Sequence, residues 1–125
     1  MPELKKYKMF INGEWVNSDT KKTFETLNPE NNKPWAIVPE ASTSDVDRAV
    51  KAAQNAFEGE WSKLLPKERA RYLRMIGDKL RDNAEHLGKI ETIDTGKLYR
   101  ETYKQANYIA EYYDYYAGLA DKVEG

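Results

Sequence analysis

The chain has 125 residues, with 20 Lys and Arg residues against 21 Asp and Glu residues and a formal net charge of -1. This balance gives no electrostatic basis for binding nucleic acid or an anionic membrane surface. Cysteine is absent, which excludes disulfides, thiolate catalysis and cysteine-ligated zinc within the chain. The single histidine, His86, excludes a histidine-rich metal site.

The apolar content of the chain is modest. The hydrophobic fraction of 40% includes nine tyrosines, and the mean hydropathy is -0.87. A single domain of this size normally buries roughly two thirds of the surface of its unfolded chain, so we expect some faces to be covered by another layer of protein. No apolar run has the length of a membrane span. Residues 1–6 lack the apolar core of a secretion signal, which predicts a cytoplasmic protein.

The first part of the chain has the pattern of two β-hairpins. Asn12-Gly13 lies between strand-forming residues, and both residues tolerate the positive φ that a type I′ turn needs. Residues 7–17 are therefore expected to form one hairpin. Residues 23–27 and 35–39 are expected to form a second strand pair, whose connection is rich in Asn and Pro.

After residue 42 the apolar residues recur every three or four positions, which predicts helices. Ser44, with Asp47 three residues later, is the expected cap of the first helix, and Gly59 is its expected end. Pro66 opens the second helix. The predicted apolar stripe of the first helix is Val46, Ala49, Val50, Ala53 and Phe57; that of the second is Ala70, Leu73, Ile76 and Leu80, flanked by Tyr72 and Met75.

Two further helices are expected. Asn83 can cap a short helix that carries Leu87 and Ile90 and ends at Gly96. A tyrosine-rich helix runs from about residue 98 to residue 117, with Gly118 as its stop. The chain on its own terms is therefore α+β, with a hairpin region at residues 7–39 and a helical region of about four helices at residues 42–118.

Several segments in this order resemble the N-terminal part of the NAD(P)-dependent aldehyde dehydrogenase superfamily. The match covers about residues 9–125 and is most similar to betaine-aldehyde-type members. The segments that carry the resemblance are residues 10–16, the Phe24 to Pro29 strand and turn, the Val38 to Ala53 entry into a helix, Trp61 with Pro66 and the Glu68 to Leu73 pattern, the Glu91 to Lys97 signature, and Tyr115-Tyr116-Ala117-Gly118.

The resemblance implies an α/β fold in which this region is a partial domain, the N-terminal portion of the Rossmann-like cofactor domain. It also implies oxidation of an aldehyde to an acid, with hydride transfer to NAD or NADP, in a parent homodimer or homotetramer. The family's oxyanion asparagine, cofactor lysine, glycine-rich loop, general base and nucleophilic cysteine all lie beyond this segment. No catalytic or cofactor-binding residue is therefore carried onto this sequence, and without a thiol no thiohemiacetal can form.

The resemblance also suggests two sites. Thr26, Leu27 and Asp94 match ligands of a structural monovalent cation, K or Na, for which carbonyl and carboxylate oxygens are suitable; alternatively, Asp94 only bonds backbone amides near Gly96.

Tyr108, Ile109 and Tyr112 match the wall of the aldehyde tunnel, and an aromatic wall suits a trimethylammonium group. Helix packing is the simpler explanation for these tyrosines. Lys97 and Arg100 are not preceded by the glycine-rich loop of a phosphate site and are expected at the solvated surface. His86 is also expected at the surface, in the first turn of its helix.

Three hypotheses follow for the chain. In the first, the chain is an inactive piece of an aldehyde dehydrogenase, and its partner is the rest of that chain. In the second, it is a small stand-alone module that uses its tyrosine-rich helix for binding or self-association. In the third, it is one half of a split enzyme.

Overall fold

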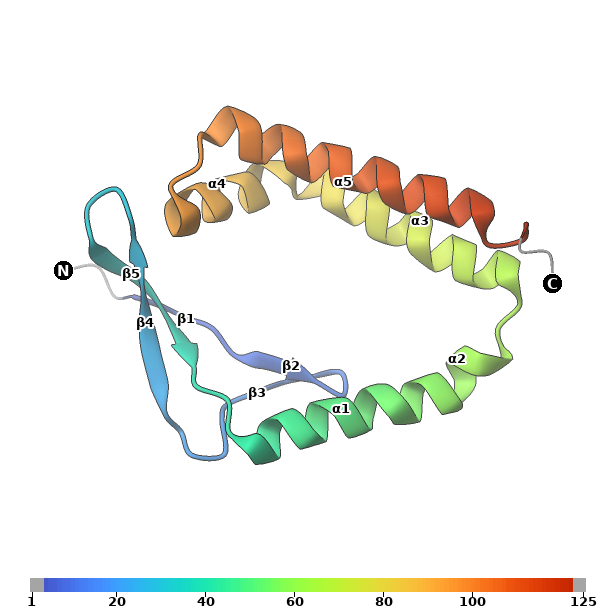
Figure 1. Ribbon diagram of the computed structural model, residues 1–125, viewed down its shortest axis with the longest axis horizontal. Helices are drawn as coiled ribbons and strands as arrows, with labels where there is room; N and C mark the ends of the chain where they lie inside the picture. The colour runs from blue at the N-terminus through green and yellow to red at the C-terminus, as the bar shows by residue number, and fades with distance from the viewer. Residues whose placement is uncertain (1–3, 123–125) are drawn as a thin grey trace. The chain divides into compact units, whose positions relative to one another are not determined.

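The computed structural model describes residues 4–122, and the chain divides into two compact units, residues 1–63 and residues 64–125 (Figure 1). The first unit contains all the strands and two helices, and the second is helical. The predicted α+β organisation is therefore confirmed. The first unit comprises β1 (Lys5–Lys6), β2 (Met9–Ile11), β3 (Glu14–Val16), β4 (Thr23–Asn28), β5 (Lys33–Pro39), α1 (Thr43–Glu58) and α2 (Glu60–Lys63); the second comprises α3 (Pro66–Asp82), α4 (Ala84–Thr95) and α5 (Tyr99–Leu119).

The first hairpin, β2–β3, forms as predicted. The strands pair antiparallel with Phe10 opposite Trp15, and the rings of these two residues lie 4.9 Å apart between centroids. Asn12 and Gly13 have φ values of 53° and 81°. These are the left-handed conformations that a type I′ turn requires, and the turn fixes the register of the two strands.

The second strand pair, β4–β5, is also confirmed, and it belongs to a three-stranded sheet in the order β1-β5-β4. The sequence did not indicate β1, which pairs parallel with β5 through only two residues. Two adjacent lysines have no apolar alternation, so only the pairing itself identifies this strand. The β4–β5 ladder shifts register between Thr26 and Leu27, where Leu27 faces Pro34.

The start of α1 differs from the prediction. Ser42, not Ser44, is the N-cap: its hydroxyl accepts a hydrogen bond from the Asp45 N–H at 3.1 Å, and the Asp45 carboxylate accepts one from the Ser42 N–H at 2.8 Å. Both serines have an aspartate three residues later, so the spacing alone could not distinguish them. Asp45 also accepts a hydrogen bond from the Ser18 hydroxyl at 2.8 Å, and this long-range contact favours the earlier cap.

The end of α1 at Gly59 agrees with the prediction, and the one-turn helix α2 that follows was not anticipated. The predicted apolar stripe of α1 is not a buried face in this structure. Val46, Val50 and Phe57 are more than half exposed. A periodic stripe shows only which side of the helix is apolar, and this side keeps its contact with solvent.

The second unit is a bundle of α3, α4 and α5 in which α5 packs against both other helices. Its buried positions are small residues, and the larger predicted residues Leu73 and Leu80 are half-buried while Ile76 is 42% exposed. Small side chains allow helix backbones to approach closely, so the close contacts between these helices occur at the small residues. The buried residues are Ala70, Gly77, Ala84, Gly88, Thr102, Ala106, Ala110 and Ala117.

The helix ends of the second unit agree only in part with expectation. Pro66 opens α3, and Gly96 ends α4 with a left-handed φ of 75°, both as predicted. Asn83 occupies the N-cap position of α4, but its side chain donates to the Lys79 carbonyl at 2.8 Å and does not cap that helix. Helix α5 continues through Gly118 to Leu119, because a glycine inside a helix costs only about 1 kcal/mol.

Candidate functional site

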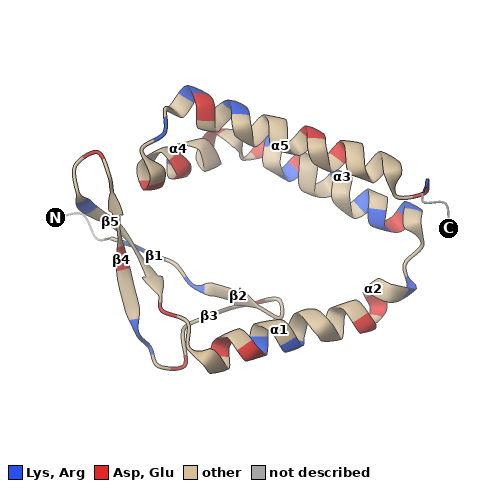
Figure 2. Cartoon of the chain, viewed as in Figure 1, with Lys and Arg blue, Asp and Glu red and all other residues tan. Residues whose placement is uncertain are grey.

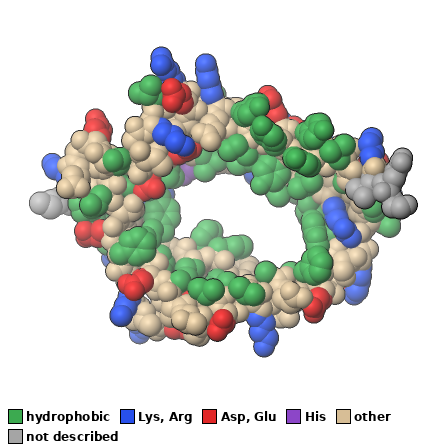
Figure 3. Space-filling model, viewed as in Figure 1, with side chains coloured by type: hydrophobic (Ala, Val, Ile, Leu, Met, Phe, Trp, Pro, Cys, Tyr) green, Lys and Arg blue, Asp and Glu red, His purple; other side chains and the backbone are tan. Residues whose placement is uncertain are grey.

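The most distinctive surface of the second unit is the exposed tyrosine face of α5, which we define as Tyr108, Tyr112, Tyr115 and Tyr116. All four side chains are about half exposed or more, from 49% to 63%. Hydrophobic side chains gather over α3 and α5 in Figure 3. The buried side of α5 is made by Thr102, Ala106, Ala110 and Ala117, so these four tyrosines lie outside it.

Within this face Tyr108 and Tyr112 form a pair one helical turn apart. Their ring centroids lie 5.1 Å apart in an edge-to-face arrangement, and the Tyr112 hydroxyl lies 3.2 Å from the Tyr108 hydroxyl. Together with Tyr115, Tyr116 and Glu111 they line an open hollow of about 380 Å³. Aromatic rings beside a carboxylate attract a cation. Ile109, the third predicted tunnel residue, is on the same helix and is 38% exposed.

The hydroxyl contact has a measurable consequence. The hydrogen bond to Tyr108 raises the pKa of the Tyr112 phenol above its usual value. We therefore expect Tyr108→Phe to lower the pKa of Tyr112, because the variant removes the hydroxyl and keeps the ring. A pH titration followed by NMR of ring-labelled tyrosine measures the shift. Tyr99→Phe, on the same helix but outside this pair, should leave the Tyr112 titration unchanged.

The predicted cation ligands are distributed over both units. Thr26 and Leu27 lie at the register shift of β4, where Leu27 faces Pro34. Asp94 is exposed near the end of α4. Among residues 4–122 there is no group of three or more His, Asp or Glu side chains that could hold a metal ion.

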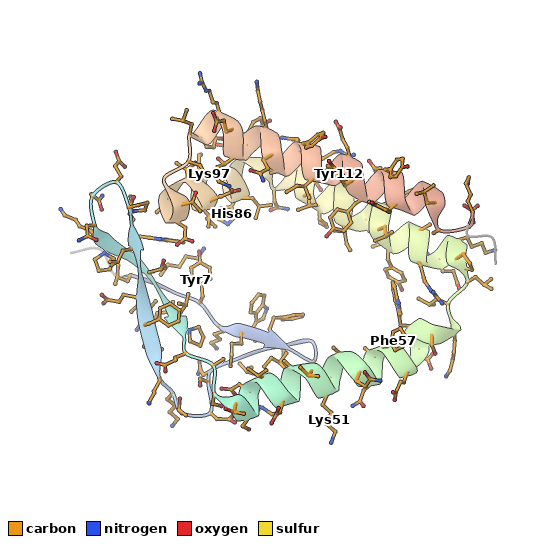
Figure 4. The ribbon with its side chains drawn as sticks, viewed as in Figure 1. Tyr7, Lys51, Phe57, His86, Lys97 and Tyr112 are labelled. Atoms are coloured by element: carbon orange, nitrogen blue, oxygen red, sulfur yellow. The ribbon has the colours of Figure 1, made fainter. Side chains whose placement is uncertain are left out.

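The remaining basic candidates are at the surface. Lys97 follows Gly96 and forms an ion pair with Glu91 at 2.7 Å, which agrees with a solvated role. His86 is exposed in the first turn of α4, as predicted. Figure 4 shows His86 on α4, Lys97 near the turn between α4 and α5, and Tyr112 on α5. Along the described part of the chain, Lys and Arg alternate with Asp and Glu in both units (Figure 2).

Sequence reasoning missed the polar cluster around Asp45, whose side chain is buried. Besides Ser42 and Ser18, Arg48 binds this carboxylate at 2.6 Å, and the Asp19 N–H lies 3.3 Å from both oxygens. The hydrogen bond from the Ser42 backbone, followed by those from Ser18, the Ser42 hydroxyl and Arg48, holds the pKa of Asp45 well below its usual range. The cluster ties the loop after β3 to the start of α1. The Ser-x-x-Asp spacing at residue 42 was the one available signal.

Comparison with known proteins identifies the family. The model of the aldehyde dehydrogenase family matches residues 15–125. A curated relative from Acinetobacter baylyi, (Z)-2-((N-methylformamido)methylene)-5-hydroxybutyrolactone dehydrogenase, is 44% identical over 98% of this chain and 25% of its own length. Aldehyde dehydrogenase family 2 member C4 of Arabidopsis thaliana is 39% identical over 100% of this chain and 25% of its own.

Solved structures give the same result. Betaine aldehyde dehydrogenase from Staphylococcus aureus, crystallised with NAD+, is 41% identical and has a TM-score of 0.89 over 93% of this chain and 24% of its own. An NAD-dependent aldehyde dehydrogenase from Sinorhizobium meliloti has 30% identity and a TM-score of 0.93 over 98% of this chain and 25% of its own. The chain thus spans about a quarter of the length of these relatives. Within residues 4–122 no helix has the length and hydropathy needed to cross a membrane. The chain belongs to the aldehyde dehydrogenase family.

Proposed function

We propose that residues 1–125 are the N-terminal part of the cofactor-binding domain of an NAD(P)-dependent aldehyde dehydrogenase, and that they support this domain without being catalytic alone. The observation that carries the proposal is the match over residues 15–125 to a family whose compared members are about four times as long. The whole enzyme would oxidise an aldehyde to a carboxylic acid through a cysteine thiohemiacetal, with hydride transfer to NAD or NADP. This sequence contains no cysteine to form that adduct.

The exposed apolar residues support a role as part of a larger body. Val50, Phe57, Trp15 and Leu98 are all more than half exposed. A few such residues are normal on a monomer, but residues of this kind recur along both units. Covering them with other protein removes apolar surface from water at about 25 cal/mol per Å². We propose that the remainder of the enzyme supplies this cover, and that the enzyme is a homodimer or homotetramer.

The substrate class proposed for the whole enzyme is a cationic aldehyde of the betaine-aldehyde type. Tyr108, Ile109 and Tyr112 would line its tunnel, with the edge-to-face tyrosine pair presenting aromatic faces to a trimethylammonium group. The likeness to betaine aldehyde dehydrogenase of S. aureus supports this choice. Helix packing against a neighbouring layer remains the competing role for these three residues.

A structural monovalent cation, K or Na, is proposed at Thr26, Leu27 and Asp94 in the whole enzyme. The two residues of β4 would contribute backbone carbonyls and Asp94 its carboxylate, which are hard oxygen ligands. If this assignment is right, KCl will raise the unfolding temperature of the whole enzyme more than tetramethylammonium chloride does, and Asp94→Asn will abolish the difference. Asp82→Asn, at the exposed end of α3, is the control and should retain it. Equal stabilisation by both salts would exclude the site.

The first test of the proposed function is activity. Purified residues 1–125 should give no aldehyde-dependent NADH or NADPH with any aldehyde. Co-expression with the remaining, cysteine-containing part of an aldehyde dehydrogenase of this family should give turnover. Turnover by the pure 125-residue chain would overturn the proposal.

A second candidate function rests on the tyrosine face of α5. Its four exposed tyrosines would suit a stand-alone binding or self-association module, because aromatic residues are enriched in interfaces. This alternative predicts a stop codon after residue 125 and a defined oligomer in sedimentation, which Tyr112→Ala with Tyr116→Ala would dissociate. A monomer in which the double substitution changes nothing would exclude it.

A further inference from the structure

We propose that Asn12 is a site of spontaneous covalent modification, at which the side-chain amide is lost as ammonia through a cyclic imide with Gly13. The inference rests on the local geometry of the β2–β3 turn and does not depend on the enzymatic role of the chain. Asn12 and Gly13 are both exposed. A Cβ placed on Gly13 would have no atom within 4 Å apart from those of its chain neighbours, so the turn has open space on this side of Gly13.

The reaction needs only water as a co-reactant. The deprotonated backbone nitrogen of Gly13 attacks the Cγ of Asn12, the C–N bond to the side-chain amide breaks, and ammonia leaves. Water then opens the five-membered imide at either carbonyl, giving aspartate, or isoaspartate with the backbone routed through the former side chain. Glycine permits ring closure because it has no Cβ to obstruct the approach.

The turn itself controls the rate. A type I′ turn holds the ψ of Asn12 near +30°, and ring closure requires that this bond rotates. The hairpin is short, with three residues in each strand, and an isolated two-stranded hairpin is only marginally stable. The free energy of local opening of this hairpin is therefore small, and we expect modification to proceed through the opened hairpin.

The product changes the hairpin. Isoaspartate adds one methylene group to the main chain of a two-residue loop, which no longer satisfies the type I′ geometry, and both products place a new carboxylate close to Glu14. The pairing of Phe10 with Trp15, whose rings contact at 4.9 Å, should be weakened by the isoaspartate product.

The chain contains an internal control at Asn32. This residue has a φ of 55°, close to the 53° of Asn12, but it precedes Lys33, which has a side chain and whose N–H donates to the Asn31 side chain at 3.0 Å. The two asparagines thus have nearly the same φ and differ in the following residue. The variant Asn12→Gly keeps a sequence that favours a type I′ turn and removes the reactive amide.

The test is incubation of the full chain at neutral and alkaline pH, with peptide mass spectrometry and an isoaspartate-specific assay. The expected result is conversion at Asn12 several-fold faster than at Asn32, faster at higher pH and in denaturant, and accompanied by a shift of the Trp15 indole resonance. Asn12→Gly should show neither the mass change at this peptide nor the Trp15 shift. Equal rates at Asn12 and Asn32, in native buffer and in denaturant alike, would overturn the proposal.

Discussion

Gly88→Ala is expected to destabilise the helical unit by about 1–3 kcal/mol, the range of overpacked core sites. A Cβ at Gly88 would lie 3.0 Å from both the Cα and the N of Tyr103. These are backbone atoms of α5, so no side-chain rotation relieves the clash, and the two helices have to separate. Urea unfolding followed by circular dichroism, which reports mainly on the helices, measures the loss.

The matched control is Gly118→Ala in the same helical unit. A Cβ at Gly118 would have no atom within 4 Å, and alanine is better than glycine inside a helix by about 1 kcal/mol. We therefore expect this substitution to stabilise the unit or leave it unchanged. The two substitutions are chemically identical, so opposite signs isolate the close approach of α4 and α5 as the cause. A stabilising effect of Gly88→Ala would show that this approach is looser than the structure indicates.

Asp45→Asn is expected to remove much of the acid sensitivity of the first unit. In the wild-type chain the backbone N–H of Ser42, then the Ser18 and Ser42 hydroxyls and Arg48, favour the ionised carboxylate and depress the pKa of Asp45 in the folded state. A depressed folded-state pKa gives a stabilisation that is present above the ordinary carboxyl pKa, about 3.9, and is lost as the pH falls below it. The wild-type chain should therefore lose stability from about pH 4 downwards.

The asparagine variant should be less stable near neutral pH, because Arg48 and the Ser42 N–H lose their charged acceptor, and its stability should vary less between pH 4 and pH 2. Thermal unfolding at a series of pH values, monitored at Trp15 or Trp35 by NMR, gives both quantities. Asp47→Asn is the control, since Asp47 is on the same helix and exposed. If Asp45→Asn and Asp47→Asn have the same pH profile, the buried cluster does not determine the acid response.

Local chemistry was sufficient to predict much of the secondary structure. The Asn12-Gly13 turn, the Pro66 start of α3 and the left-handed Gly96 at the end of α4 were all predicted from the sequence and are present in the structure. Each depends on the φ preference of one or two residues, and such preferences act independently of the rest of the fold. The family resemblance, read from ordered motifs, was confirmed by the comparisons.

The tertiary structure alone decided which surfaces are buried and which of two equivalent caps is used. Ser42 and Ser44 both have an aspartate three residues later, and the contact of Asp45 with Ser18, 27 positions away in sequence, distinguishes them. Helix periodicity predicted Ala70, Leu73, Ile76 and Leu80 as the buried face of α3. Ala70 is buried, but the larger residues are not, and α3 is also buried at Gly77, where a Cβ would lie 3.2 Å from the Ala110 carbonyl oxygen. Periodicity reports which side of a helix is apolar, whereas burial depends on how closely a neighbouring backbone can approach, and that distance is set by the smallest residues on both helices.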